Sequence, residues 1–297
     1  MEIIYKHLNG VQTQLITWGN PFDCGGLDVI VCITGNPGVP DFYIEFGSEL
    51  HKCTGLPVCV IGQAGHLHVP DFQSNILEGN QHLFNLEGQL AHKFDLINNH
   101  IDKKSKLHFI GHSIGAWMIT ELLQKHAAIH ERTSSVSLLF PTLQRMADTR
   151  NGKFLNGFLR RIHGLVVILF SLLYLIPESI RAICIQTYLK ICSLPPHYLE
   201  RIMKYLHPLV NEKVLFLAYD EMDTVQKLNN EAIDKIKHLT YVIYSTDDGW
   251  APIHYMDDLK PFEPMLQMKE VNIAHAFVLK SPEPVAEMVV DFIKTKL

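Results

Sequence analysis

The stretch Lys106–Gly115 constrains the fold of this chain more than any other part of it. Its first half, Leu107–Ile110, is β-rich, and the residues after Gly115 have the apolar spacing of a helix. Between them, Gly111–Gly115 reads G-H-S-I-G. Such a turn holds its serine in a strained conformation at the tip of a strand, and the glycines omit side chains that would collide with the neighbouring strand and helix. We therefore predict that Ser113 faces a cleft as a nucleophile.

The motif has little weight alone, because glycine and serine are common and a serine in an ordinary glycine turn looks the same. The rest of the chain supplies the context. Continuous or alternating apolar runs predict further strands, and apolar residues at helical spacing predict the helices between and after them. The strands are expected at Val11–Trp18, Asp28–Ile33, Leu56–Gly62, Ser135–Phe140, Lys237–Ser245 and Met265–Val271, and the helices at Gln81–His100, from Ile253 and at Pro284–Lys296. This alternation predicts an α/β protein with a mostly parallel central sheet and helices on both faces.

The regular alternation stops at Pro141 and resumes near Lys237. With 297 residues, of which 47% are hydrophobic, one α/β domain with an insertion fits better than two equal domains. We expect residues 1–140 and 238–297 to form the two parts of this core. Residues 141–237 then form a helical lid or insertion.

The insertion contains an unusually apolar segment at about residues 160–194. Ile162–Pro177 runs for 16 residues without a charged side chain, and Arg181–Leu194 continues the apolar character with two positive charges. A bilayer span needs roughly twenty apolar residues, so the first run is short for a span. A hydrophobic hairpin or a pair of interfacial helices fits these lengths better. The alternative is a buried core helix of a lid.

A serine nucleophile needs a base that removes its proton and an acid that orients the base. After a strand-turn-helix nucleophile these partners follow along the chain as an acid and then a histidine, each on a loop after a strand. Asp248 follows the strand Lys237–Ser245, and His275 alone among the histidines follows the last predicted strand. The neighbouring Asp247 is the rival acid. We favour Asp248, because it precedes Gly-Trp-Ala-Pro, in which the proline opens the next helix, and Asp247 is then a solvated or capping carboxylate.

The oxyanion of an acyl-transfer intermediate needs two backbone donors. One should be the N–H group of Ile114, the residue after the nucleophile. The other should come from Thr34-Gly35-Asn36-Pro37-Gly38, a turn-rich loop directly after a central strand. Asn36 is the candidate because Pro37 has no N–H group. A plain turn explains the glycines and proline of this loop equally well.

Composition excludes several other classes of function. A net charge of -5 gives no electrostatic footprint for nucleic acid. The cysteines show no C-x-x-C pair and no metal-ligand spacing, which is typical of reduced thiols in an intracellular protein. They are Cys24, Cys32, Cys53, Cys59, Cys184 and Cys192. No cleavable secretory signal is evident at the N-terminus, and the predicted chemistry requires neither a metal nor an organic cofactor.

Four motifs together resemble the lipid droplet-associated hydrolase family of the α/β-hydrolase superfamily: TGNPG, GHSIG, TDDGWAP and NIAHAF. The resemblance covers nearly the whole chain. It implies a serine hydrolase on lipid droplets and the endoplasmic reticulum, anchored by a hydrophobic segment, with ester lipids including sterol esters as the suspected substrates. Position by position, it places the nucleophile on Ser113, the acid on Asp248 and the base on His275, and the membrane segment on Ile162–Pro177 and its continuation.

These observations predict a serine hydrolase of sterol esters or related neutral lipids at the cytoplasmic face of the lipid droplet and endoplasmic reticulum. Its partners are the lipid ester and the lipid monolayer, which it contacts through the hydrophobic insertion. Two alternatives stay open: a lipid-surface protein with little turnover, and a thioesterase that uses the same residues. Epoxide hydrolases and haloalkane dehalogenases share a similar G-N-P loop, but they carry a carboxylate where this chain has Ser113.

Overall fold

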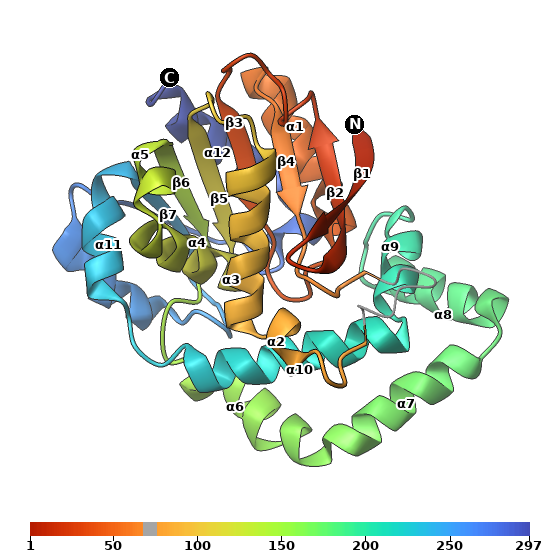
Figure 1. Cartoon of the computed structure of the whole chain (residues 1–297). Helices are drawn as coiled ribbons and strands as arrows, with labels where there is room; N and C mark the ends of the chain where they lie inside the picture. The colour runs from red at the N-terminus through yellow and green to blue at the C-terminus, as the bar shows by residue number, and fades with distance from the viewer. Residues whose placement is uncertain (68–75) are drawn as a thin grey trace.

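The computed structural model describes residues 1–67 and 76–297. Within them, eight strands form one sheet in the order β1-β2-β4-β3-β5-β6-β7-β8 (Figure 1). Neighbouring strands from β4 to β8 are parallel, whereas β1 and β2 run antiparallel to their neighbours. The strands are β1 Glu2–Leu8, β2 Val11–Trp18, β3 Val29–Ile33, β4 Val58–Ile61, β5 Leu107–His112, β6 Thr133–Leu139, β7 Thr240–Ser245 and β8 Gln267–Val271. The predicted mostly parallel α/β sheet is confirmed.

The central strand β3 is buried on both faces, because its side chains alternate between two hydrophobic cores. Val29, Val31 and Ile33 belong to one core, and Ile30 and Cys32 to the other. Helices from distant parts of the chain supply the rest of each core (Figure 1). The first core is completed by α3 (Leu86–Asp95), α4 (Ile114–Lys125) and α11 (Asn230–Ile236), and the second by α1 (Ile44–Thr54) and α12 (Pro282–Lys294).

The sequence analysis missed β1 and α1. Strand β1 joins β2 through a two-residue turn in which Asn9 and Gly10 both have positive φ angles, 46° and 78°. Asn-Gly favours this turn because both residues tolerate the left-handed region, and its twist matches that of a hairpin. β1 is an edge strand in which only Leu8 is fully buried in the core, whereas Ile3 is 45% exposed and Tyr5 55%. It therefore lacks the burial pattern on which the prediction of the other strands rests.

The predicted helix Gln81–His100 is interrupted at Asn85, which is extended and caps the next helix by accepting a hydrogen bond from the Gly88 N–H. Asparagine favours this capping position because its side-chain oxygen satisfies an otherwise unpaired amide. Residues 81–84 and 96–100 of the predicted helix and the predicted helix from Ile253 are helical, and the sequence analysis did not predict the other short elements. The remaining elements comprise α2 Gln81–Phe84, the π-helical η3 Leu96–His100, α5 Ala127–Glu131 and the 3₁₀ turns η1 Pro40–Tyr43, η4 Met146–Asp148, η6 Lys237–Leu239, η7 Ile253–Phe262 and η8 Phe277–Leu279.

A group of helices between β6 and β7 forms a cap beside the core, at the end where the parallel strands finish (Figure 1). Its elements are α6 Arg150–Gly157, η5 Leu159–Ile162, α7 His163–Leu175, α8 Glu178–Ile191, α9 Tyr198–Tyr205 and α10 Pro208–Thr224. α10 contacts both the core helix α3 and the outer helix α7. The cap therefore has an inner layer, α10, and an outer layer, α7 and α8.

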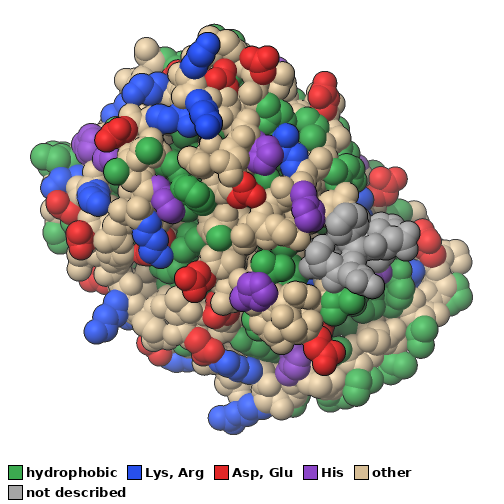
Figure 2. Space-filling model, viewed as in Figure 1, with side chains coloured by type: hydrophobic (Ala, Val, Ile, Leu, Met, Phe, Trp, Pro, Cys, Tyr) green, Lys and Arg blue, Asp and Glu red, His purple; other side chains and the backbone are tan. Residues whose placement is uncertain are grey.

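Helix α7 has no buried residue, so it is not a core helix of this chain. Leu165, Ile168, Leu169 and Leu172 are 53–57% exposed and form one helical stripe, which we call the α7 stripe. Figure 2 shows hydrophobic side chains along this outer edge of the molecule. α7 is the end of a helical run of 26 residues, Arg150–Leu175, which contains an 18-residue window with a mean hydropathy of 1.7. By length and composition alone this run could cross a membrane, although basic residues occupy its first half.

Candidate active site

Ser113 lies on a sharp turn between β5 and α4, with φ 54° and ψ -121°. This left-handed conformation is strained for a residue with a side chain. The flanking glycines are required by close contacts. A Cβ atom on Gly115 would lie 2.5 Å from the carbonyl oxygen of Ile33, and one on Gly111 would lie 2.7 Å from the backbone of Ala116. The local sequence therefore produces the predicted strand-turn-helix.

The side chain of Ser113 begins a chain of hydrogen bonds that joins three loops at the same edge of the sheet. Its Oγ lies 3.0 Å from Nε2 of His275, which follows β8. On the other side of the ring, Nδ1 of His275 lies 2.6 Å from Oδ2 of Asp248, which follows β7. The structure thus brings together the three residues selected from the sequence. They meet because parallel strands end at one edge of the sheet.

Asp248 and not Asp247 contacts His275. The Asp248 side chain is buried, and its Oδ1 accepts from the backbone N–H groups of Trp250 at 2.7 Å and Ala251 at 3.0 Å. Burial alone would raise the pKa of Asp248, but the His275 ring and these amides outweigh it and hold the pKa below its ordinary value. The Asp247 side chain is 85% exposed and lies 3.8 Å from Arg150.

The two candidate oxyanion donors lie on either side of Ser113. Ile114 is the first residue of α4, where a backbone N–H has no partner within the helix. Asn36 follows β3 and lines the same cavity as Ser113 and His275. Across residues 1–67 and 76–297, no backbone or side-chain group accepts a hydrogen bond from either amide. Both N–H groups are therefore available to a ligand.

A second hydrogen-bond chain supports these loops from behind, and the sequence analysis missed it. The Gly35 N–H donates to Oη of Tyr43 at 2.9 Å, Tyr43 Oη lies 2.6 Å from Nδ1 of His112, and Nε2 of His112 lies 2.9 Å from the carbonyl oxygen of His275. A carbonyl oxygen only accepts, so His112 carries its proton on Nε2 and the Tyr43 hydroxyl donates to Nδ1. No motif marked Tyr43, because its two partners, Gly35 after β3 and His112 at the end of β5, belong to other parts of the chain.

His112 is neutral in this arrangement. Burial, with a smaller contribution from the nearby His275 ring, lowers its pKa to about 3. Burial also raises the pKa of Tyr43 far above its ordinary value. The chain from Gly35 to His275 therefore keeps one protonation pattern across the physiological pH range.

Replacing Tyr43 with phenylalanine is expected to lower the free energy of unfolding by about 2–4 kcal/mol, because two buried groups each lose a partner at roughly 1–3 kcal/mol per group. Urea unfolding monitored by circular dichroism measures this change. Tyr5→Phe is the matched control, since Tyr5 is 55% exposed. Equal effects of the two substitutions would show that the buried hydroxyl contributes nothing.

Two cavities of about 200 and 310 Å³ adjoin His275, and the smaller one also adjoins Ser113. Asn36, Pro37, Trp250 and His275 line both of them. Apolar side chains form much of the remaining walls. The smaller cavity lies against the cap and is lined by Met146, Leu155, Val214, Leu215 and Ala218, and the larger includes Phe42, Val278 and Leu279. Together they form a largely apolar cleft on both sides of His275.

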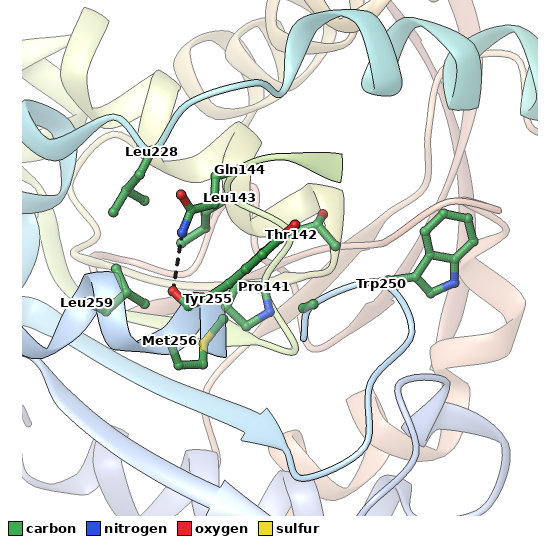
Figure 3. Close-up of a pocket in the computed structure, with 10 residues that line it drawn as sticks. Pro141, Thr142, Leu143, Gln144, Leu228, Trp250, Tyr255, Met256 and Leu259 are labelled. Atoms are coloured by element: carbon green, nitrogen blue, oxygen red, sulfur yellow. Dashed lines mark hydrogen bonds between the residues drawn. The ribbon is translucent and has the colours of Figure 1, made fainter. Parts of the chain in front are cut away.

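A third cavity, of only about 10 Å³, lies where the loop Pro141–Gln144 meets η7 (Figure 3). Gln144 donates its side-chain amide to the carbonyl oxygen of Tyr255 at 3.2 Å. The Trp250 side chain points away from the other labelled residues in Figure 3. A space of this size holds about one water molecule, so it is a packing junction that supports the Asp248 loop. Within the described residues, no group of three or more His, Cys, Asp or Glu side chains is placed to hold a metal ion.

Comparison of the whole chain with solved structures identifies a known fold. An enol-lactonase from Burkholderia xenovorans superimposes with a TM-score of 0.64 at 16% identity, over 98% of this chain and 100% of the other. A meta-cleavage product hydrolase from Pseudomonas fluorescens gives a TM-score of 0.65 at 13% identity, over 98% and 97% of the two chains. At such low identity these likenesses show the α/β-hydrolase fold alone.

Sequence comparison is more specific. Residues 28–278 match the model of a family described as lipid-droplet associated hydrolase. A lipid droplet-associated hydrolase from Drosophila melanogaster is 40% identical over 303 residues, which span 99% of this chain and 98% of the relative. The human protein of the same name is 30% identical over 282 residues, which span 91% and 85% of the two chains. This protein therefore belongs to the lipid droplet-associated hydrolase family of α/β-hydrolases.

Proposed function

We propose that this protein is a serine hydrolase that cleaves lipid esters through an acyl-enzyme. The observation that carries the proposal is the continuous hydrogen-bond chain from Ser113 through His275 to Asp248, placed at the mouth of a largely apolar cleft. A strained serine, a ring in contact with it and a buried carboxylate on the far side of the ring are the parts that nucleophilic acyl transfer needs.

In the proposed mechanism, His275 takes the proton of Ser113 as its oxygen attacks the ester carbonyl carbon. The N–H groups of Asn36 and Ile114 stabilise the negative oxygen of the tetrahedral intermediate. Asp248 stabilises the charged His275 ring, which then protonates the departing alcohol. Water, activated by the same ring, cleaves the acyl-enzyme and regenerates Ser113. The sequence of steps uses no metal and no organic cofactor.

The cleft walls support a neutral lipid as the substrate, with sterol esters or related esters as the class to test first. The names of the relatives add support, since they place those proteins at lipid droplets. We further propose that the protein works at the cytoplasmic face of the lipid droplet and endoplasmic reticulum. Such a location would let a substrate enter the cleft from the lipid phase.

A panel of substrates tests this proposal. The purified protein is incubated with emulsions of sterol esters, acylglycerols and retinyl esters, and with acyl thioesters, and the released fatty acid is measured with Ser113→Ala as the control. Turnover of an oxygen ester by the wild type alone is expected. Turnover confined to thioesters would favour a thioesterase that uses the same residues. Equal background release by both proteins would favour a lipid-surface role without catalysis.

We propose that the α7 stripe and the exposed face of α8 rest in the lipid monolayer. One face of α8 packs on α9 through Ile185 and Leu189, while Ile183 and Ile191 on the other face are 62% and 78% exposed. Exposed apolar helix faces of this extent mark a lipid or protein contact. Flanking basic residues such as Lys190 suit the negatively charged headgroup region.

Replacing Leu165, Ile168, Leu169 and Leu172 with serine is expected to weaken binding to artificial lipid droplets about 100-fold or more, since each apolar side chain contributes roughly 1.5–3 kcal/mol on full burial. Flotation of the protein with the droplets measures the bound fraction. The control replaces Ile3 and Tyr5, exposed apolar residues of β1, with serine. Unchanged flotation of the α7 variant would show that another surface binds lipid.

A further inference from the structure

The cap touches the candidate oxyanion loop through a carboxyl group that the mechanism above does not use. Glu221, on α10, is only 4% exposed and lines the same cavity as Ser113 and His275. Its Oε1 accepts a hydrogen bond of 2.9 Å from the side-chain amide of Asn36. The same Asn36 amide donates a hydrogen bond of 3.1 Å to the carbonyl oxygen of Val214. Val214 lies on α10, two helical turns before Glu221. Both contacts of the Asn36 side chain therefore come from the cap.

Nothing near Glu221 offsets a negative charge on its carboxyl group. Among the described residues, no lysine, arginine or histidine forms an ion pair with it. Most of the cavity wall that η4 and the cap contribute is apolar, with Met146 and Leu155 from η4 and α6 and Ala218 from α10 itself, and Tyr205 of α9 adds a phenol group. A carboxylate without a cation in such surroundings is costly, whereas a neutral carboxylic acid is not.

We propose that Glu221 is a positioning residue of this hydrolase site, which ties the Asn36 loop to the cap helix α10 and supports catalysis only in its uncharged form. The inference rests on the proposed function, in which the Asn36 N–H stabilises the oxyanion. Holding the Asn36 side chain from α10 fixes the orientation of that N–H group. A charged Glu221 would place a second negative charge close to the developing oxyanion, in a low-dielectric cleft where the repulsion is strong.

The protonation of Glu221 follows from its surroundings. Burial, with a smaller contribution from the negative charge of Asp220, outweighs the hydrogen bond from Asn36 and raises the pKa of Glu221 to about 8. Glu221 is therefore uncharged below about pH 8 and becomes charged above it. His275 lies across the cavity. Tyr205 of α9 lines the same cavity. The other charged or titratable groups on the elements packed against α10 are His82 on α2, Glu87, His92, Lys93 and Asp95 on α3, Asp148 on η4, Arg150 and Lys153 on α6, and His163 and Tyr174 on α7.

The test is the rate at which a neutral fluorophosphonate probe labels Ser113 between pH 6.5 and 9.5, in the wild type, Glu221→Gln and Glu221→Ala. The wild-type rate is expected to fall about tenfold per pH unit above the Glu221 pKa, because only the uncharged form is productive. Glu221→Gln keeps a hydrogen-bond acceptor for Asn36 and cannot ionise, so its rate is expected to stay level. Glu221→Ala also cannot ionise but loses the acceptor, and we expect it to be labelled about tenfold more slowly than Glu221→Gln at every pH.

Asp223→Asn is the matched control, because Asp223 lies on the same helix and bonds Arg160 on the outer surface. It should follow the wild-type profile. A Glu221→Gln profile that falls like the wild type, or Glu221→Ala labelling as fast as the wild type at pH 6.5, would overturn the proposal for Glu221.

Infrared spectra separate this inference from the proposed function. The difference spectrum of wild type minus Glu221→Gln should show the carbonyl band of a protonated carboxyl group at pH 6.5 and lose it by pH 9.5. Absence of the band at pH 6.5 would overturn the proposal for Glu221 even if Ser113 is labelled normally. Absence of labelling of the wild type at every pH would instead contradict the nucleophile, and with it the role of Glu221.

Discussion

Replacing Ser113 with alanine is expected to lower kcat/KM for a lipid ester by a factor of about 10⁴ or more, with the fold intact. The serine oxygen forms the covalent bond to the acyl group, and alanine offers no atom that can do so. The remaining oxyanion donors and cleft still bind the substrate, so a small residual rate above that of water is expected. Release of fatty acid from an emulsion measures the loss, and thermal unfolding verifies the fold.

Ser137→Ala is the matched control for this substitution. Ser137 lies on β6 next to the nucleophile strand, is fully buried, and its hydroxyl has no hydrogen-bond partner within the described part of the chain. Its removal should leave kcat/KM unchanged. Undiminished hydrolysis by Ser113→Ala, or continued labelling of that variant by a fluorophosphonate probe, would refute Ser113 as the nucleophile.

Replacing Asp248 with asparagine is expected to lower kcat/KM by a factor of about 10³–10⁴, while the same change at Asp247 leaves it near the wild-type value. An asparagine amide cannot stabilise the charged His275 ring, and it favours the tautomer that presents a proton to Ser113. Asp247 has an exposed side chain whose ion pair among the described residues is with Arg150 and not with His275.

These two variants form a pair that differs by one position in the same loop, and both exchange a carboxylate for an amide. Side-by-side kinetics with one ester substrate therefore isolate the contact between Asp248 and His275 from the general effect of removing a charge. Similar losses in the two variants would show that the loop and not the contact determines the rate.

Much of the fold followed from local patterns. The strand-turn-helix at Lys106–Gly115 was recognisable because the strand, the turn with its two glycines and the start of the helix are consecutive in the sequence. The buried strand Asp28–Ile33 was visible because a strand with helices on both faces is apolar throughout. β1 and α1 were missed. Strand β1 exposes Ile3 and Tyr5, so it lacks the burial pattern of the other strands.

The apolar segment of the insertion was also only partly predictable from the sequence. Its composition indicated a lipid-facing element, but composition does not distinguish a helix with exposed apolar side chains from one buried in a lid. The structure leaves the α7 stripe uncovered by the described residues, and this exposure supports the proposed lipid contact. Residues from Arg150 onward extend the helical run to 26 residues, which is longer than the run of apolar residues alone.

The sequence by itself determined the order Ser113, Asp248, His275 and the loops that carry them, because each residue follows a strand and parallel strands end at one edge of a sheet. Only the tertiary structure decided which of two adjacent aspartates turns toward His275. It alone also revealed the Tyr43 to His112 chain and the contact of Glu221 with Asn36. These features join residues from 69 to 185 positions apart, and their energies depend on burial, which no local pattern specifies.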